Sequence, residues 1–210
     1  MSRYIFGVGK GEIAEGAEAY LKRRGFGVKV AGKPVLTQSV GNVTFRIVNA
    51  RDVPRFVGKG YDFGITGRDF CEDERLTGNG NFVYTDELGF GGGWIVLYGA
   101  RRRDNPLIVV PADIQNLGGK YAQKLFSCFS ILPVNGATEG YVSSGEADCG
   151  IDFMSDKNDT PEYVGTIKRN GLIVLEKLMP TQAMLLESNE KDNSRDAKAV
   201  RSCIAGKPKI

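Results

Sequence analysis

The chain has 210 residues, 41% of them hydrophobic, which is enough to form one large core or two smaller ones. Its net charge is only +3, from 28 basic and 25 acidic residues. So small a net charge does not create the basic surface that binds nucleic acid. We therefore expect a small anionic ligand rather than a polymer. The absence of histidine excludes His-based triads, His general bases and His metal sites.

The cysteines and the apolar segments indicate where the protein resides. The four cysteines are widely spaced and form no C-x-x-C pair, which argues against a zinc knuckle and favours free thiols in a reducing compartment. The N-terminus has no apolar stretch long enough for a signal peptide, and no segment approaches the roughly 20 apolar residues of a membrane span. We therefore expect a cytoplasmic protein with no membrane and no nucleic-acid partner.

Short apolar runs in the first half of the chain predict strands that alternate with helices. The strands are expected at residues 4–8, 43–48, 62–66, 82–87 and 94–98. Helices are expected from Ile13 to Leu21, from Asp52-Val53-Pro54 onward, and after Asp69.

A second alternating series follows a polar crossing at residues 100–106. Its strands are expected at residues 107–110, 131–134, 149–153 and 183–186, and its helices at residues 120–129, 139–144, 164–170 and 192–204. The crossing contains Arg101, Arg102 and Arg103 in succession, which we interpret as a solvated surface loop rather than a binding patch. The alternation predicts an α/β protein with open, largely parallel sheets and helices on their faces.

The stretch from Asn135 to Gly140 joins an apolar strand to a helix. Free backbone N–H groups and the positive end of the helix would face the mouth of this turn, where an anion is stabilised. Taken alone, the hexapeptide fits an ordinary turn capped by Thr138 equally well. Asp152, at the end of the next strand, lies where ligands meet open α/β sheets, or else it caps the segment that follows.

Several motifs occur in a fixed order along the chain. They are Gly9-Lys10-Gly11, Asp52-Val53-Pro54, residues 62–69 (Asp-Phe-Gly-Ile-Thr-Gly-Arg-Asp), residues 88–91, residues 136–139 (Gly-Ala-Thr-Glu), residues 145–148 (Gly-Glu-Ala-Asp), Asp152 and residues 166–172. Together they resemble ATP phosphoribosyltransferase, the first enzyme of histidine biosynthesis. The similarity runs from about residue 4 to about residue 187, which no single short motif achieves by chance.

The length resembles the short form of that family, a catalytic subunit that works with a regulatory subunit related to histidyl-tRNA synthetase. The resemblance implies a two-lobed type II periplasmic-binding-protein-like fold, with open mixed sheets and the site in the interlobe cleft. Lobe I would comprise residues 1–98 and 180–210, and lobe II, residues 99–179, would carry the phosphoribosyl-binding turn. A homo-oligomer is expected.

The implied reaction is the attack of N1 of ATP on C1 of phosphoribosyl pyrophosphate, with loss of pyrophosphate assisted by Mg²⁺. Such a displacement suits a site without histidine, because it needs orientation and charge stabilisation more than a strong base.

The resemblance also implies roles for individual residues. It implies catalytic roles for Glu139, Asp152 and Lys10. Phosphoribosyl and phosphate contacts fall on Gly136, Ala137, Thr138, Gly140, Ser155, Gly165 and Thr166, and nucleotide contacts on Gly11, Thr66, Arg68 and Asp69. The metal ligands stay unassigned, with Mg²⁺ expected near Asp152. The plainer alternatives are a solvated Lys10, a helix cap at Asp69 and an ordinary helix start at Gly165-Thr166.

Three cations that the resemblance leads us to expect are replaced, by Glu12, Asn49 and Trp94. Each lost arginine would remove a charge-assisted contact of about 1.5 to 3 kcal/mol, so full activity is in question. This leaves open a non-catalytic homologue that binds a nucleotide or sugar phosphate as a sensor or partner subunit. An insertion containing residues 156–159 also lengthens the phosphate loop between Asp152 and Thr166, as a lid or a surface excursion.

Overall fold

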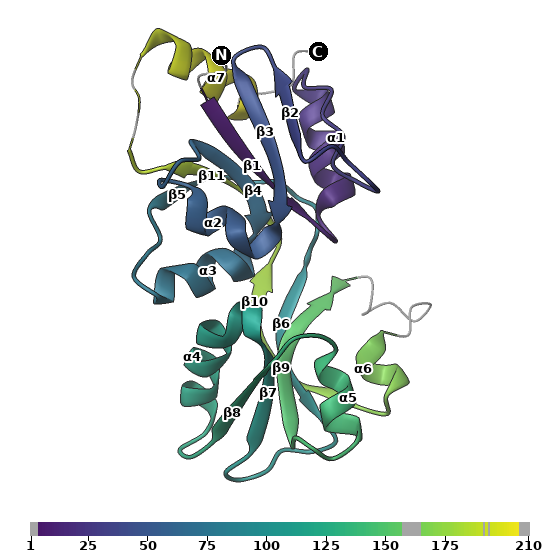
Figure 1. Cartoon of the computed structure of the whole chain (residues 1–210). Coiled ribbons are helices and arrows are strands. Elements are labelled where there is room, and N and C mark those ends of the chain that lie inside the picture. The colour runs from purple at the N-terminus through teal and green to yellow at the C-terminus, as the bar shows by residue number, and fades with distance from the viewer. Residues whose placement is uncertain (1–3, 157–164, 191, 193, 206–210) are drawn as a thin grey trace. The chain divides into compact units, whose positions relative to one another are not determined.

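The chain forms two compact units, Met1–Gly91 with Gln182–Ile210 (unit 1) and Gly92–Thr181 (unit 2), as Figure 1 shows. The computed structural model describes residues 4–156, 165–190, 192 and 194–205. The boundaries expected from the sequence, at residues 98 and 180, differ from these. Strand β6 (Gly93–Gly99) belongs to unit 2 because it is hydrogen-bonded between β9 (Cys149–Ser155) and β10 (Ile173–Thr181) of that unit.

Unit 1 contains a six-stranded mixed sheet in the order β2-β3-β1-β4-β11-β5. Its strands are β1 (Tyr4–Lys10), β2 (Thr37–Val40), β3 (Val43–Asn49), β4 (Phe63–Gly67), β5 (Phe82–Glu87) and β11 (Ala183–Ser188). β1 is parallel to β3 and β4, whereas β2, β11 and β5 pair antiparallel to their neighbours. The carboxyl ends of β1, β3 and β4 therefore share one edge of the sheet, the edge at which open α/β sheets bind ligands.

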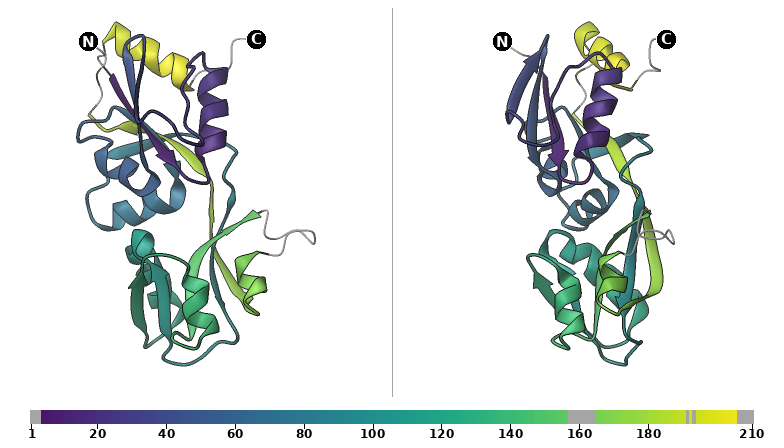
Figure 2. Two further views of the ribbon diagram at one scale, coloured as in Figure 1. Left: turned by 45° about the vertical axis from the view of Figure 1, so that its right-hand side comes forward. Right: turned by 90° about the vertical axis from the view of Figure 1, so that its right-hand side faces the viewer.

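Helices cover both faces of the unit 1 sheet (Figure 2). α1 (Ala14–Arg23) and α7 (Arg195–Ala205) contribute Leu21 and Val200 to a core with Phe6 of β1. On the other face, α2 (Val53–Phe56), after a 3₁₀ turn at Ala50–Asp52, and α3 (Arg68–Leu76) bury Val53 and Cys71. Successive strand residues point to opposite faces, so the buried runs of β4 and β11 serve both cores.

Unit 2 contains a five-stranded mixed sheet in the order β10-β6-β9-β7-β8, completed by β7 (Leu107–Pro111) and β8 (Ser130–Val134). β7 is parallel to β8 and β9, whereas β6 and β10 are antiparallel additions. α5 (Thr138–Ser143) and α6 (Thr166–Arg169) pack on the face that carries Val96 and Tyr98. α4 (Gln115–Leu125), after a 3₁₀ turn at Ala112–Ile114, packs Gly118 against Val110 of β7.

The predicted alternation of strands and helices is present in both units, but the sheets are mixed rather than largely parallel, and three elements differ from the prediction. Strand β2 was not predicted, and neither was β10, whose register shifts and polar residues disrupt the alternation that marks a strand. Helix α4 begins at Gln115 rather than at residue 120, because Gly118 and Gly119 weaken the helical signal. No helix in the described parts of the chain is long and apolar enough to cross a membrane.

The contact between Tyr98 and Gly150 gives a test of the unit 2 core. A Cβ atom at residue 150 would lie 2.7 Å from Tyr98 Cε1 and would overlap the phenol of this fully buried side chain. We expect Gly150→Ala to lower the free energy of unfolding by about 1 to 3 kcal/mol, measured by chemical denaturation. Gly119→Ala on α4 is the control, because its Cβ meets no described atom within 4 Å. Equal stability of the two variants would contradict this packing.

Candidate functional site

The turn between β8 and α5 is exposed to solvent. Gly136 has a φ of +118°, a conformation that favours glycine, and its Cβ position meets no described atom within 4 Å. Asn135 and Ala137 beside it are exposed. The predicted turn is therefore present, and its amide groups are accessible to a ligand.

A hydrogen bond ties this turn to the neighbouring strand. Thr138 is fully buried, and its Oγ1 donates to Asp152 Oδ2 at 2.5 Å, while the backbone N–H of Phe153 donates to Asp152 Oδ1 at 2.6 Å. Ala137 is the N-cap residue of α5, and no side chain caps this helix. The alternative of a Thr138 cap is therefore wrong, and two predicted residues, Thr138 and Asp152, are in direct contact.

Tyr98, which is not among the predicted site residues, lies on the same face of the sheet as Asp152. It is fully buried on β6, directly opposite Gly150 of β9. Burial raises the pKa of Tyr98 far above its usual value, and the negative charges of Asp152 and Glu139 add to this rise, while the Thr138 hydroxyl opposes it. The phenol therefore stays protonated, within electrostatic reach of both predicted carboxylates. No sequence signal distinguishes it from an ordinary core tyrosine.

The other predicted residues of unit 2 lie at the ends of its elements. Gly140 is exposed on α5, and Ser155 ends β9 half-buried. Gly165 is the buried N-cap residue of α6, and Thr166 is its exposed first residue. Lys157, Asn158 and Asp159 of the insertion lie outside the described residues.

Lys10 and Gly11 line a concavity of about 820 Å³ in unit 1. Lys10 is exposed at the end of β1, and Gly11, with a φ of +97°, turns the chain towards α1. The remaining lining residues are apolar (Ala14, Val30, Ala31, Pro34 and Leu36), acidic (Glu12 and Glu15), Gly32 and basic (Lys33). The apolar walls suit a flat apolar group, and the two lysines, balanced in charge by the two glutamates, can contact its polar substituents.

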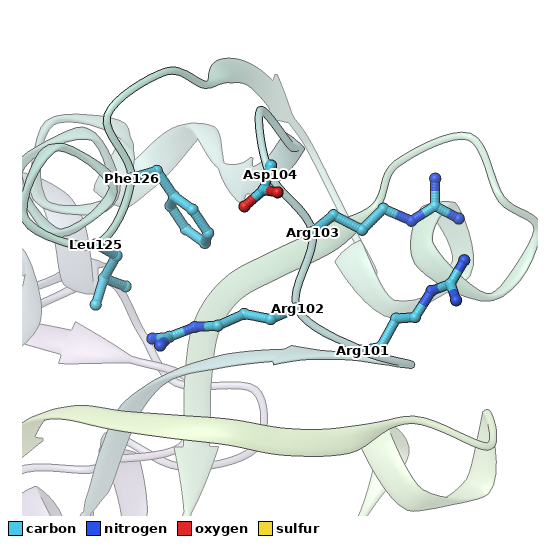
Figure 3. A pocket seen from close by; sticks show the side chains of 6 residues that line it. All are labelled: Arg101, Arg102, Arg103, Asp104, Leu125 and Phe126. Carbon is cyan, nitrogen blue, oxygen red and sulfur yellow. The ribbon is translucent and has the colours of Figure 1, made fainter.

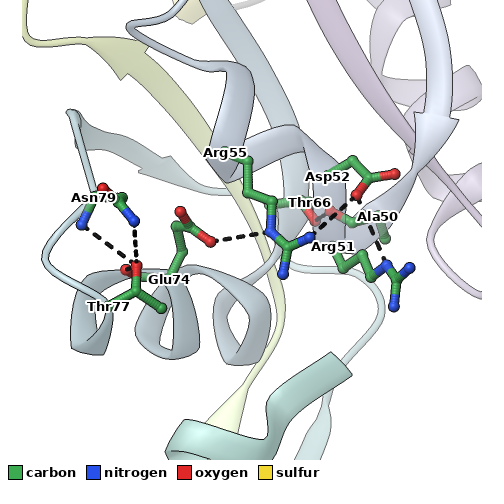
Figure 4. A network of polar contacts seen from close by, with 8 residues as sticks. All are labelled: Ala50, Arg51, Asp52, Arg55, Thr66, Glu74, Thr77 and Asn79. Atoms are coloured by element: carbon green, nitrogen blue, oxygen red, sulfur yellow. Dashed lines mark hydrogen bonds and ion pairs between the residues drawn. The ribbon is translucent and has the colours of Figure 1, made fainter. Parts of the chain in front are cut away.

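The three other nucleotide-contact candidates surround the end of β4 and do not line this concavity. Thr66 is buried, and its Oγ1 donates to the carbonyl of Ala50 at 2.6 Å (Figure 4). The guanidinium of Arg68 lies 3.9 Å from Glu87, and its buried Nε has no hydrogen-bond partner among the described residues. Asp69 is buried but does not cap α3, whose N-cap residue is Gly67.

Two arginines follow Asn49, where the resemblance leads us to expect a cation, and both are engaged (Figure 4). Arg55 Nε lies 3.1 Å from the buried carboxylate of Glu74, and its Nη1 lies 3.7 Å from Asp52. Arg51 lies 3.7 Å from the same Asp52 oxygen. This network links the helices of one face, so Arg55 has a structural role.

The triple arginine lines a second concavity of about 600 Å³ with Asp104, Leu125 and Phe126 (Figure 3). Arg102 extends towards Phe126, with its guanidinium 5.9 Å from the ring centroid, and forms an ion pair with Glu176. Arg103 Nη1 lies 2.9 Å from Asp148. Since two of the three cations have local acidic partners, these contacts support the surface-loop interpretation.

No cluster of three or more metal-ligating side chains occurs within the described residues. Mg²⁺ keeps several waters and is commonly held by one or two carboxylates together with substrate phosphates. Asp152 and Glu139 are carboxylates of the kind that hold such an ion, and the charges of both raise the pKa of Tyr98.

Comparisons with known proteins identify the family. The HisG model, ATP phosphoribosyltransferase, matches residues 49–205. The ATP phosphoribosyltransferase of Petrotoga mobilis is 31% identical over 193 residues, which cover 84% of this chain and 81% of that protein.

Two solved structures share the fold. The ATP phosphoribosyl transferase (HisG:HisZ) complex from Thermotoga maritima aligns with a TM-score of 0.75 at 19% identity, covering 94% of this chain and 93% of that one. The periplasmic aliphatic sulphonate binding protein SsuA from Escherichia coli aligns with a TM-score of 0.52 at 14% identity, covering 96% and 67%. The predicted type II periplasmic-binding-protein-like fold is thus confirmed, and the chain belongs to the ATP phosphoribosyltransferase family.

Proposed function

We propose that this chain transfers the phosphoribosyl group of phosphoribosyl pyrophosphate to N1 of ATP, the first step of histidine biosynthesis. The observation that carries the proposal is the open turn at Gly136, anchored by the hydrogen bond from Thr138 to Asp152. Membership of a family of transferases supports catalysis and does not favour the alternative of a non-catalytic binding homologue.

In unit 2, the phosphate groups of the reacting sugar and its ribose, which gains positive charge at C1, would contact different protein groups. The exposed amides of the turn at Gly136 would bind phosphate oxygens, and the carboxylates of Glu139 and Asp152 would face the ribose. Each carboxylate oxygen has two lone pairs, and one on each oxygen of Asp152 accepts from Thr138 or Phe153. The negative charge of Asp152 would stabilise positive charge as C1 loses pyrophosphate.

Mg²⁺, when bound, would neutralise the charge that develops on the departing pyrophosphate. Glu139 and Asp152 are the side chains proposed to hold it. No protein base is required for the attack, because N1 of adenine carries a free lone pair. The protein's contribution is then to orient two anionic substrates and to stabilise charge, in keeping with a chain that has no histidine.

In unit 1, the lysine-rimmed concavity is the proposed ATP site. Its apolar walls suit adenine, and Lys10 and Lys33 would contact phosphates. Arg68, which does not line this concavity, stays a separate candidate for contact with the nucleotide, because its buried Nε has no hydrogen-bond partner among the described residues. Glu12 in the same lining adds a negative charge, so we expect weaker ATP binding than an arginine at that position would give.

We also propose a homo-oligomer and a regulatory partner subunit in the cytoplasm. The solved Thermotoga maritima relative is a complex of HisG with HisZ, and a chain of the short form is expected to need a subunit of that kind.

The reaction itself is the first test. Purified protein mixed with ATP, phosphoribosyl pyrophosphate and Mg²⁺, with and without a regulatory subunit, is expected to form the N1-substituted nucleotide, which absorbance and mass spectrometry detect. Absence of product under both conditions, with the protein folded, would exclude this activity.

Neutralising either carboxylate tests the phosphoribosyl half of the site. We expect Glu139→Gln and Asp152→Asn to weaken binding of phosphoribosyl pyrophosphate about tenfold or more, because a charge-assisted contact is worth about 1.5 to 3 kcal/mol. Calorimetric titration measures the affinity. Glu146→Gln, an exposed acid of the same unit, is the matched control and should bind as the wild type does. Unchanged affinity in both site variants would place the sugar elsewhere.

A single lysine tests the nucleotide half. Lys10→Met is expected to raise the dissociation constant for ATP about tenfold or more, since it removes a cation from the rim of the concavity. Lys22→Met, on the last turn of α1 and outside that lining, should leave ATP binding unchanged. An equal response of the two variants would contradict the proposed position of ATP.

A further inference from the structure

A cation–π pair on the unit 2 sheet has no role in the function proposed so far. Lys177 of β10 places its Nζ 5.3 Å from the centroid of the Trp94 ring on β6. Lys177 is exposed, whereas Trp94 is partly buried. The partly buried ring therefore supports the ammonium group of an exposed lysine.

The strand register places Lys177 on the face that carries the phosphoribosyl turn. Lys177 pairs directly with Val96 of β6, and Val96 pairs directly with Asp152 of β9. Residues directly opposite one another in antiparallel strands point to the same face, so these three form one row across the sheet. Two interstrand spacings separate the Cα atoms of Lys177 and Asp152, about 10 Å in all.

The surroundings of Trp94 connect the pair with the start of α6. Trp94 packs against a core that contains Val96, Met154 and Ile167 of α6. α6 begins directly after Gly165, with Thr166 as its first residue, and these two residues are the candidates for contact with the sugar 5-phosphate. The ring that supports the lysine thus packs against the same hydrophobic core as the helix that carries this proposed contact.

An ammonium held over an aromatic ring is well suited to bind phosphate. The ring attracts the cation without neutralising it, and it restricts the rotamers of a flexible four-carbon stem. Less conformational freedom is then lost when a phosphate binds. Trp94 also occupies a position where the family resemblance leads us to expect a basic residue. Lys177 on the neighbouring strand therefore supplies the positive charge that the Trp94 side chain lacks.

We propose that Lys177, held in place by Trp94, binds the 5-phosphate of the phosphoribosyl substrate. The identity of this ligand rests on the proposed function. The interaction itself is a separate claim, because it concerns binding of a ribose phosphate and requires neither ATP nor turnover.

The sequence contains one tryptophan, so the intrinsic fluorescence of Trp94 reports directly on the pair. Titration of the folded protein with ribose 5-phosphate is expected to change this fluorescence, whereas ribose at the same concentrations should not. Lys177→Met and Lys177→Gln should weaken ribose 5-phosphate binding about 10- to 150-fold in calorimetry, and Lys177→Arg should retain most of it.

A second lysine in the same unit provides the matched control. Lys124 Nζ also lies 5.3 Å from an aromatic centroid, that of Tyr121 on α4, so Lys124→Met removes the same kind of pair elsewhere. It should bind ribose 5-phosphate like the wild type. Wild-type affinity in the Lys177→Met and Lys177→Gln variants, or no binding to the wild-type protein, would overturn the proposal. Loss of binding in these variants of a protein that forms no product would support the phosphate contact and reject the reaction.

Discussion

The hydrogen bond from the buried hydroxyl of Thr138 to Asp152 holds together the part of unit 2 on which the proposed chemistry depends. It joins the first residue of α5 to β9, so the turn at Gly136 and the Asp152 carboxylate form one structural element. An unpaired buried hydroxyl or carboxylate would be costly, and the pair satisfies both groups. The open turn thus keeps its position through a buried contact, while its amides stay available for a ligand.

Charge is distributed in an unusual way for a protein that is proposed to bind two polyphosphate substrates. Glu12, Asn49 and Trp94 occupy positions where the resemblance leads us to expect cations. The nearby arginines do not simply replace them, since Arg55 pairs with Glu74 and Asp52. The proposed cations come instead from Lys10, Lys33 and Arg68 in unit 1 and Lys177 in unit 2.

In the second sheet, a strand whose sequence lacks a clear apolar–polar alternation organises the candidate site. β10 has register shifts and polar residues, which is why alternation did not reveal it. Its pairing with β6 nevertheless defines unit 2, brings Glu176 to Arg102, and places Lys177 in the row of Asp152. Strand pairing through the backbone tolerates such side chains because the ladder depends on N–H and C=O groups.

The sequence by itself determined the α/β class, most strands, the turn at Gly136 and, through its ordered motifs, the family. These are local or collinear properties, since glycine turns, apolar runs and motif spacing need no knowledge of distant contacts. Only the tertiary structure decided that Thr138 bonds Asp152 rather than capping α5, that Tyr98 lies over Gly150, and that Lys177 stacks on Trp94. The Tyr98 and Lys177 contacts depend on strand register, and the Thr138 contact depends on how α5 packs beside β9; no local sequence pattern encodes either arrangement.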